Sequence, residues 1–441
     1  MQAFIDFFTG ALNDFAWLYM FLPCVMVGGI LLTVRTKAVQ FSHFGYAMKN
    51  TVGKMFKKTE AGKGAVTPLQ AVTTALAATV GTGNIVGTSQ AIALGGYGAV
   101  FWLWVAALLG MVIKYSEVVL SIQYRQRDEK GDWVGGPMYY IAGIGPKWKW
   151  LAMVYAALAG IACFGIGNMS QVNAITGSIT NAITAFFTIN DSGITVIHWV
   201  IGLSLAALVA LILFGGIKRI GKVAEKLVPI MSVFYVLVCL GVIFSHAGNI
   251  GGAFAKIFTA AFSPRAVLGA ASGIALKEAL VWGLRRSAFS NEAGLGSAAI
   301  AHAAAETPSA VHQGLYGIFE VFVDTIVICS MTALTIICSG VDINFGVKPG
   351  SELITAAVAT IFGGNILHNP LFILLFSTLK ITISPLSNNI LLISVIRLSP
   401  HDETKNTLLI FTSTLYYGHG YLLVISHFRQ ASYYVKKEVR L

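Results

Sequence analysis

Charged residues are scarce in this chain, and their scarcity decides its class. Only 11% of its 441 residues are charged, whereas 56% are hydrophobic, and the mean hydropathy is +0.74. Soluble globular chains carry roughly 25% charged residues, so this chain has too few to cover a surface that faces water. We therefore expect one integral membrane domain in contact with lipid, in place of the roughly three soluble domains that length alone would predict.

Signals of metal binding, disulfide bonding and nucleic-acid binding are also absent. The five cysteines lie in apolar runs without the paired spacing of metal ligands: Cys24, Cys163, Cys239, Cys329 and Cys338. They predict no disulfide framework and no redox role. The net charge of +11 comes from basic residues in short loops between apolar runs, so it predicts membrane topology and no nucleic-acid partner.

Enzyme and channel signatures are missing as well. The sequence contains no His-Glu-x-x-His, Gly-x-Ser-x-Gly or Walker-type motif. Residues 377–380 spell Ser-x-x-Lys, but the companion motifs of that enzyme class are missing, so chance accounts for the match. A channel would show repeated filter loops or rings of charge, and neither is present. We expect no catalytic activity and no cofactor.

Long apolar runs are what the sequence has in abundance. A bilayer core of roughly 30 Å needs about 20 apolar residues in a helix. Ten runs are candidate spans: Ala16–Val34, Gln70–Leu94, Val100–Ser121, Trp150–Thr184, Thr195–Gly215, Leu227–Ser245, Ala266–Leu284, Leu315–Cys338, Pro370–Ile396 and Leu408–Phe428. Their continuous apolar character favours helices over barrel strands, so we predict an all-α membrane protein with about 10–11 transmembrane helices. The run Trp150–Thr184 predicts either one long tilted helix or a helix with a polar end.

Lysine and arginine gather in three loops, and this bias predicts the orientation. The loops cover residues 35–65, 125–149 and 218–226, whereas the stretch 187–193 between the last two has no basic residue. Basic loops stay in the cytoplasm. We therefore predict a multi-pass protein of the cell inner membrane with its N-terminus outside.

Two apolar segments are interrupted by glycine and polar residues. The first interruption is Gly81-Thr82-Gly83-Asn84, and the second lies within residues 282–294, in the corresponding place of the other half. Backbone that leaves helical geometry at membrane depth persists only where it is buried in protein or lines a cavity. A half-helix that begins there offers free N–H groups to a carboxylate, and one that ends there offers carbonyls to a cation. Paired interruptions of this kind predict the binding site of a secondary transporter.

A simpler interpretation of the first interruption is helix packing. Gly83 and Gly87 have the spacing of small residues that let helices approach each other. Packing alone does not account for the polar residues Thr79, Thr82 and Asn84 at the same depth. Both interpretations stay open, and the ligand site is preferred.

Six blocks of the sequence resemble the alanine/glycine:cation symporters, also called the sodium:alanine symporter family. They are residues 75–85 (ALAATVGTGNI), 95–104 (GGYGAVFWLW), 114–117 (KYSE), 135–140 (GGPMYY), 165–171 (GIGNMSQ) and 289–296 (FSNEAGLG). The resemblance implies a fold of the amino acid-polyamine-cation type, with two inverted five-helix repeats, broken helices and one extra N-terminal helix. It implies import of alanine or glycine, in the L or D form, coupled to Na⁺.

The same resemblance implies a division of the chain. Residues 1–65 would hold the extra helix and a basic cytoplasmic loop. Residues 66–250 would form the first repeat, and residues 251–441 the second.

The resemblance also implies a set of substrate-binding residues. They are Thr79, Gly81, Thr82, Gly83, Asn84, Phe164, Gln171 and Gly283. Gln171 could instead make a hydrogen bond between helices, and Phe164 could simply pack. Gly283 stands where the second broken helix is expected to open.

The coupling ion needs oxygen ligands. Carbonyl groups near Ala78 and Gly81, with the hydroxyls of Ser377 and Thr378, are the candidate Na⁺ ligands that the resemblance implies. The same fold coupled to H⁺ stays open as an alternative.

Six charged residues lie in or near the predicted spans: Lys114, Glu117, Lys277, Glu278, Glu320 and Asp324. Charges inside a membrane are rare and pair with each other or mark an ion pathway. We expect structural pairing for each of them, with Lys114 and Glu117 on one helix face. A role in a cation pathway is most plausible for Asp324.

The resemblance ends near residue 380. Where the family has a tryptophan, this chain has Thr382. A change of reading frame and a divergent C-terminal end are both open, and either would raise the alternative of a transport-impaired variant.

Overall fold

The computed structural model describes residues 10, 12–51, 53, 62, 65–163, 169–184, 187–214, 216–262 and 276–362. Helices dominate this part of the chain. Five of them are long and apolar enough to cross a membrane: Asn13–Arg35, Ala99–Tyr124, Asp191–Ile212, Lys218–Ser245 and Ala310–Ser339. The expected all-α integral membrane fold is confirmed, whereas the predicted spans after residue 362 lie outside the described residues.

The first span is continuous and is followed by two short helices. It consists of α2 (Asn13–Phe15), the π-helical turn η2 (Ala16–Phe21) and α3 (Leu22–Arg35). The short helices α4 (Val39–Ser42) and α5 (Phe44–Thr51) follow it. Together these elements match the predicted span at residues 16–34 and the start of the first basic loop.

The first interrupted helix begins with a capping box. The Thr67 hydroxyl accepts from the backbone N–H of Gln70, and the Gln70 side chain accepts from the backbone N–H of Thr67. Helix α6 (Pro68–Thr79) starts there and ends before the interruption; the chain resumes as the π-helical turn η4 (Gly83–Gly87) and α7 (Thr88–Gly95).

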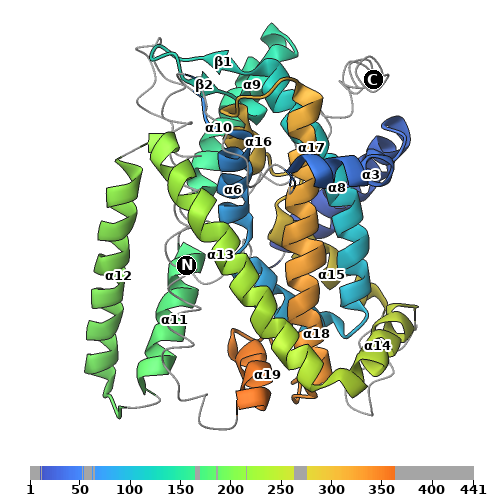
Figure 1. The fold of residues 1–441 in the computed structure, drawn as a ribbon, viewed down its shortest axis with the longest axis vertical. Coiled ribbons are helices and arrows are strands. Elements are labelled where there is room, and N and C mark those ends of the chain that lie inside the picture. The colour runs from blue at the N-terminus through green and yellow to red at the C-terminus, as the bar shows by residue number, and fades with distance from the viewer. Residues whose placement is uncertain are drawn as a thin grey trace.

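Helix α8 (Ala99–Tyr124) is the central helix of the fold. It packs against α3, against the C-terminal helices α15 (Leu276–Asn291) and α17 (Ala310–Val321), and against α14 (Ile250–Phe262). Its buried face therefore meets elements from both halves of the chain. A two-stranded antiparallel sheet, β1 (Gln126–Arg127) and β2 (Trp133–Val134), follows it at one end of the molecule (Figure 1).

The predicted long span at residues 150–184 contains two helices in the structure. After α9 (Pro137–Gly143) and the turn η5 (Pro146–Trp148), the chain forms α10 (Lys149–Ala162) and then α11 (Ser170–Thr184). Residues 164–168 between them lie outside the described residues.

Helices α12 (Asp191–Leu213) and α13 (Gly216–Ser245) follow as two long spans. Helix α12 stands at the edge of the molecule and α13 crosses its front (Figure 1). Large apolar side chains on α12, such as Trp199 and Leu203, are exposed, as expected for a surface in lipid.

The short turn η7 (Ala247–Asn249) leads from α13 to α14. The described part of α14 has 13 residues, fewer than the roughly 20 that span a bilayer, and no span was predicted there.

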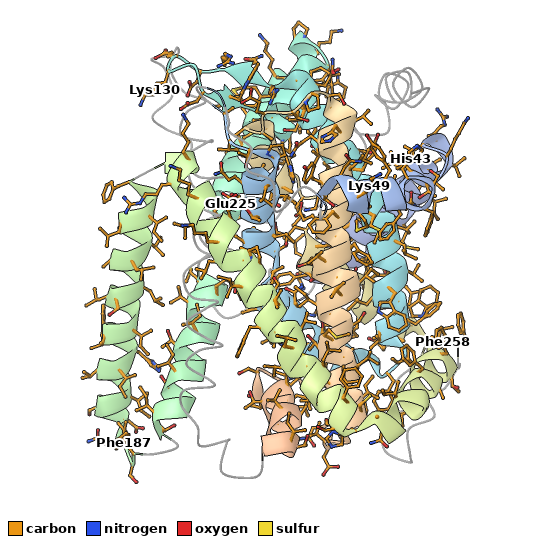
Figure 2. All side chains as sticks on the ribbon, in the orientation of Figure 1. His43, Lys49, Lys130, Phe187, Glu225 and Phe258 are labelled. Carbon is orange, nitrogen blue, oxygen red and sulfur yellow. The ribbon has the colours of Figure 1, made fainter. Side chains whose placement is uncertain are left out.

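One labelled residue from each of the three basic segments lies at the same end of the molecule. Lys49 on α5, Lys130 between β1 and β2, and Glu225 near the start of α13 are all in the upper part of Figure 2. Phe187, from the stretch without basic residues, lies at the lower end. The basic segments and the stretch without basic residues thus lie at opposite ends, as expected if they face opposite sides of the membrane.

The second interruption lies further along the chain than Gly283. Helix α15 runs without a break to Asn291, and α16 (Ser297–Ala303) follows a turn. Glu292, Gly294 and Gly296 in this turn have positive φ angles, and glycine adopts such angles without a steric penalty. The expectation that the helix opens at Gly283 is wrong.

Gly283 has a packing environment instead. A Cβ atom there would lie 2.5 Å from the Ala99 backbone oxygen and 2.7 Å from the Cβ atom of Trp102. The glycine lets α15 lie directly on α8, which accounts for a glycine within a continuous helix.

The last long helix among the described residues contains a π-helical stretch. It consists of α17, which begins at the Ser309 cap, η8 (Phe322–Cys329) and α18 (Ser330–Ser339). Helix α19 (Glu352–Phe362) is the last described element. The largest apolar core lies between α6, α13 and α18, with Leu76, Tyr235 and Ile336 among its buried members.

Candidate functional site

The first interruption is stabilised by its own asparagine. The backbone N–H of Gly81 donates to Asn84 Oδ1 at 2.7 Å. Asn84 therefore supplies an acceptor to the first amide of the interruption, which has lost its helical partner. The Thr82 N–H points to Gln171 Oε1 at 3.4 Å, so α11 also contacts this segment.

The side-chain nitrogen of Asn84 connects three elements. It donates to Ser290 Oγ at 2.9 Å, to the Asp324 backbone oxygen at 2.9 Å and to Asp324 Oδ1 at 2.8 Å. Asn84 is fully buried. Ser290 lies in the last turn of α15 and Asp324 in the π-helical stretch η8. One amide thus joins both interrupted helices to the helix that carries Asp324.

Asp324 is surrounded by hydrogen-bond donors. Its Oδ2 atom accepts from Ser290 Oγ and from Thr325 Oγ1, each at 2.8 Å. Within the described part of the chain, no lysine, arginine or histidine lies within 4.0 Å of its carboxylate. Asp324 is fully buried. A carboxylate that is hydrogen-bonded but has no ion-pair partner favours a bound cation beside it.

The π-helical geometry of η8 bears on this position. π-Helical stretches are rare and frequently occur at functional sites, because the wider turn changes where side chains point. In η8, the backbone oxygen and the carboxylate of Asp324 both accept hydrogen bonds from the side-chain nitrogen of Asn84.

The structure brings several predicted substrate-binding residues together. Gly81, Thr82, Asn84 and Gln171 are linked by the hydrogen bonds described above. Gly83 lies against α15: a Cβ atom there would be 3.1 Å from Ser290 Cα. These contacts leave little space around the interruption.

Other predicted residues are less central or fall outside the described part. The Thr79 hydroxyl points back to the Ala75 and Leu76 carbonyls of its own helix, at 3.4 and 3.5 Å. Ala78 lies in the last turn of α6, where carbonyl groups lose their helical partners. Phe164, Ser377 and Thr378 lie outside the described residues.

Sequence reasoning missed the partners of Asn84 on α15. Ser290 was part of a block that carried the family resemblance, but no role was assigned to it. Asn291 follows it and donates to Thr325 Oγ1 at 3.1 Å. A usable signal was the pair of small polar residues directly before the turn, since polar side chains at membrane depth face other polar groups.

The remaining buried charges pair differently from the prediction. Lys114 Nζ lies 3.2 Å from Glu320 Oε1, and His302 Nε2 lies 3.4 Å from Glu320 Oε2. The expected structural pairing is therefore present for Lys114 and Glu320. Glu117 is not within ion-pair distance of Lys114 and instead accepts from the backbone N–H groups of Gly294 and Gly296, in the second interruption.

Comparison with known proteins gives a consistent result. Residues 1–400 match the model described as the sodium:alanine symporter family, a match that runs past residue 380. The chain is 40% identical over 338 residues to a transporter of Haemophilus influenzae, covering 76% of this chain and 70% of that protein. It is 41% identical over 338 residues to the sodium/alanine symporter AgcS of Methanococcus maripaludis, covering 75% of this chain and 70% of AgcS.

A solved structure shares the fold. The chain resembles the crystal structure of MhsT in complex with L-phenylalanine, with a TM-score of 0.53 and 16% identity, covering 84% of this chain and 81% of MhsT. At this identity the likeness shows a transporter fold of the LeuT type, in which two inverted repeats each contribute an interrupted helix.

Proposed function

Since the chain belongs to the sodium:alanine symporter family, we propose that it imports alanine or glycine together with Na⁺ by alternating access. The coarser conclusion, a cation-coupled amino-acid symporter in a multi-pass membrane fold, follows from the family. The observation that best supports the finer proposal is the Asn84–Ser290–Asp324 junction, where both interrupted helices meet a buried carboxylate.

The substrate carboxylate is proposed to bind at the first interruption. The N–H groups of residues 81–83 lie where a half-helix begins, and this end of a helix attracts an anion. Gln171 and Asn84 border the segment and can hold the substrate's polar groups. The close approach of Gly83 to α15 leaves little space for a substrate side chain beside this segment, which favours a small amino acid.

The coupling cation is proposed to bind beside the same segment. The Ala78 and Gly81 carbonyls, with Ser377 and Thr378 beyond the described residues, are one proposed ligand set. Asp324 is a further candidate ligand, because its buried carboxylate has no ion-pair partner among the residues that the structure describes. Hard oxygen ligands of these kinds suit Na⁺.

Uptake into proteoliposomes tests the proposal directly. Purified protein should accumulate labelled alanine when an inward Na⁺ gradient is imposed, and unlabelled glycine should compete more strongly than leucine. Uptake that ignores Na⁺ but follows a pH gradient would instead support the H⁺-coupled alternative. Absence of uptake under both gradients, with alanine binding retained, would favour the transport-impaired variant.

We place the protein in the cell inner membrane with its N-terminus outside. Accessibility labelling checks this orientation at two exposed positions. Lys130→Cys should react with a membrane-impermeant reagent only after the cytoplasmic side is opened, and Thr188→Cys should react in intact spheroplasts. The reverse pattern would invert the proposed topology.

A further inference from the structure

Two adjacent arginines on α15 have different surroundings. Arg285 Nη2 lies 2.9 Å from Asp14 Oδ1 on α2, so the charge of Arg285 has a carboxylate partner. Arg286 is half-buried and has no acidic side chain within 4.0 Å among the residues that the structure describes. Its Nε atom is buried without a hydrogen-bond partner in that part of the chain. Charged side chains at membrane depth are rare and normally paired, so the unpaired guanidinium of Arg286 points to a function.

Arg286 lies between the two interrupted helices. A Cβ atom at Gly83 would lie 3.1 Å from Ser290 Cα, and one at Gly87 would lie 3.5 Å from Arg286 Cδ. A step of four residues forward along η4 thus corresponds to a step of four residues backward along α15, which is antiparallel packing. The absence of a side chain at Gly87 leaves room for the aliphatic part of Arg286.

The antiparallel packing also tells on which side of the interruption Arg286 lies. Further along, a Cβ atom at Gly95 would lie 2.8 Å from Trp282 Cβ, and the first turns of α15 also contact α14. Helix α14 lies in the lower part of Figure 1, away from the basic segments. Arg286 is therefore one helical turn, about 5.4 Å, from Ser290 toward the side that is proposed to face outward.

Aromatic rings hold the guanidinium in this place. The Arg286 Cζ atom lies 5.2 Å from the ring centre of Trp282 and 5.8 Å from that of Phe289, within the range of about 6 Å for cation–π contacts. The Phe289 ring in turn lies 3.5 Å from the position of a Cβ atom at Gly83. Packing against these rings is the simpler interpretation of Arg286. It stabilises the charge, but it supplies no oxygen acceptor for the N–H donors of the guanidinium.

The sequence places no acidic residue where it would provide that acceptor. Residues 263–275, directly before α15, and the predicted spans Pro370–Ile396 and Leu408–Phe428 contain no aspartate or glutamate. Glu278, the other acid-bearing position on α15 before the turn, is eight residues from Arg286, or about 12 Å along the helix axis. A carboxylate that comes from outside the protein fits the position, because a guanidinium binds a carboxylate through two parallel N–H···O hydrogen bonds.

We propose that Arg286 binds the carboxylate of the incoming amino acid one helical turn outward of the first interruption. The proposal rests on the proposed function, since it takes the amino acid as the substrate. From Arg286 the carboxylate passes to the N–H groups of residues 81–83. The guanidinium repels the ammonium group of the substrate, so the amino acid approaches with its carboxylate toward α15. Arg285 has no such role, because Asp14 already neutralises it.

Initial rates of Na⁺-driven alanine uptake by the full chain in proteoliposomes test the proposal. Arg286→Gln removes the charge but keeps a side-chain amide. Attraction between charges raises association rates by about 10- to 10³-fold, and the lower end applies because alanine has no net charge. At alanine concentrations far below half-saturation, the rate of Arg286→Gln should therefore be about tenfold lower than that of the wild type. The maximal rate and the equilibrium affinity for alanine should stay within about twofold, whereas a merely structural role would lower them.

Two further variants separate the charge from the position. Arg286→Lys keeps the charge without the planar fork of donors, so its rate at low alanine should be within about threefold of the wild type. Arg285→Gln is the matched control and should follow the wild type. A wild-type rate at low alanine in Arg286→Gln would overturn the role of Arg286 and leave the proposed function intact. A wild type that neither binds nor takes up alanine would overturn the proposed function, and the role of Arg286 with it.

A pair of variants at Gly87 keeps the test decisive if Arg286→Gln does not fold, because it leaves Arg286 in place. An added Cβ atom at Gly87 meets Arg286 Cδ at 3.5 Å, an ordinary contact distance. Gly87→Asp brings a carboxylate to the guanidinium and occupies it, whereas Gly87→Asn has the same size without the charge. Uptake at low alanine should be about tenfold slower in Gly87→Asp than in Gly87→Asn. Equal rates in the two variants would contradict carboxylate binding at Arg286.

Discussion

The side-chain nitrogen of Asn84 lies 2.8 Å from Asp324 Oδ1, although the two residues are 240 positions apart. This hydrogen bond joins the first interrupted helix to η8, and Ser290 joins the second interrupted helix to the same carboxylate. A displacement of either half-helix therefore changes the surroundings of one buried charge. Coupling between amino acid and cation needs such a shared element.

Removing the charge of Asp324 should weaken Na⁺ binding strongly and should affect the stability of the fold less. In Asp324→Asn the side chain keeps its shape and one acceptor oxygen, but it no longer carries a charge to balance a cation. We expect the Na⁺ concentration for half-maximal alanine binding to rise at least about tenfold, which corresponds to about 1.4 kcal/mol. A Na⁺ titration of alanine binding measures it.

The matched control for that variant is Ser330→Ala. Ser330 begins α18 and accepts from Trp104 Nε1 at 2.8 Å, away from the carboxylate. The Ser330→Ala variant should leave the Na⁺ titration of alanine binding unchanged. A titration of Asp324→Asn that overlays the wild type would remove Asp324 from the cation site.

Truncating Asn84 should lower the affinity for alanine. Asn84→Ala removes the hydrogen bonds that hold the first interruption against Ser290 and Asp324, so the proposed carboxylate-binding segment and the candidate cation ligand lose their fixed positions, and this loss outweighs the freeing of the Gly81 N–H. We expect alanine affinity to fall by about 10- to 100-fold, measured in a scintillation proximity assay at equal protein amounts. Asn84→Asp should be at least as damaging, because it replaces a donor with a negative oxygen beside Asp324; wild-type affinity in both variants would contradict the assignment.

The two glycines of the first interruption should differ in their tolerance of a methyl group. A Cβ atom at Gly83 would meet the backbone of Ser290 at 3.1 Å, whereas one at Gly81 would meet the side-chain amide of Gln171 at 3.1 Å. Backbone cannot move aside as a flexible side chain can, so Gly83→Ala should reduce alanine binding more than Gly81→Ala. Gly28→Ala on α3, with nothing within 4 Å of the added atom, is the control; equal losses at positions 81 and 83 would refute the geometric argument.

Gly283 should prove to be a packing residue. A Cβ atom there would lie 2.5 Å from backbone on α8, and overpacking of this kind costs about 1–3 kcal/mol or more. Gly283→Ala should therefore lower the melting temperature of the purified protein, while the alanine affinity of the folded fraction stays within about twofold of the wild type. Lost affinity at an unchanged melting temperature would restore its predicted role in substrate binding.

The parts of the fold that depend on local composition were predictable. Apolar runs gave the long spans, and the glycines with Asn84 marked the first interruption, because polar residues inside an apolar run are visible in the sequence. The second interruption was placed too early. Both Gly283 and Gly294 are glycines in the same interrupted segment, but Gly283 lies within the continuous helix α15, directly against α8, whereas Gly294 lies in the turn after it.

The convergence of Asn84, Ser290 and Asp324 was not predictable. Asp324 was recognised as a buried acid, but its partners depend on the rotation of α15 and on the π-helical stretch η8, which are set by tertiary packing. Lys114 illustrates the same limit. Its neighbour along the helix is Glu117, yet its ion-pair partner is Glu320 on another helix.

The hydrogen bond from the Gly81 N–H to Asn84 Oδ1 bears on the ligand-free protein. A buried N–H without a partner costs about 1–3 kcal/mol, and the chain avoids this cost by providing its own acceptor at 2.7 Å. A carboxylate that arrives at this amide replaces an existing acceptor, so it gains only the difference between the two. The hydrogen bond within the protein therefore lowers the affinity for a carboxylate at this amide. A lower affinity suits a carrier that must release its substrate on the other side of the membrane and then return without it.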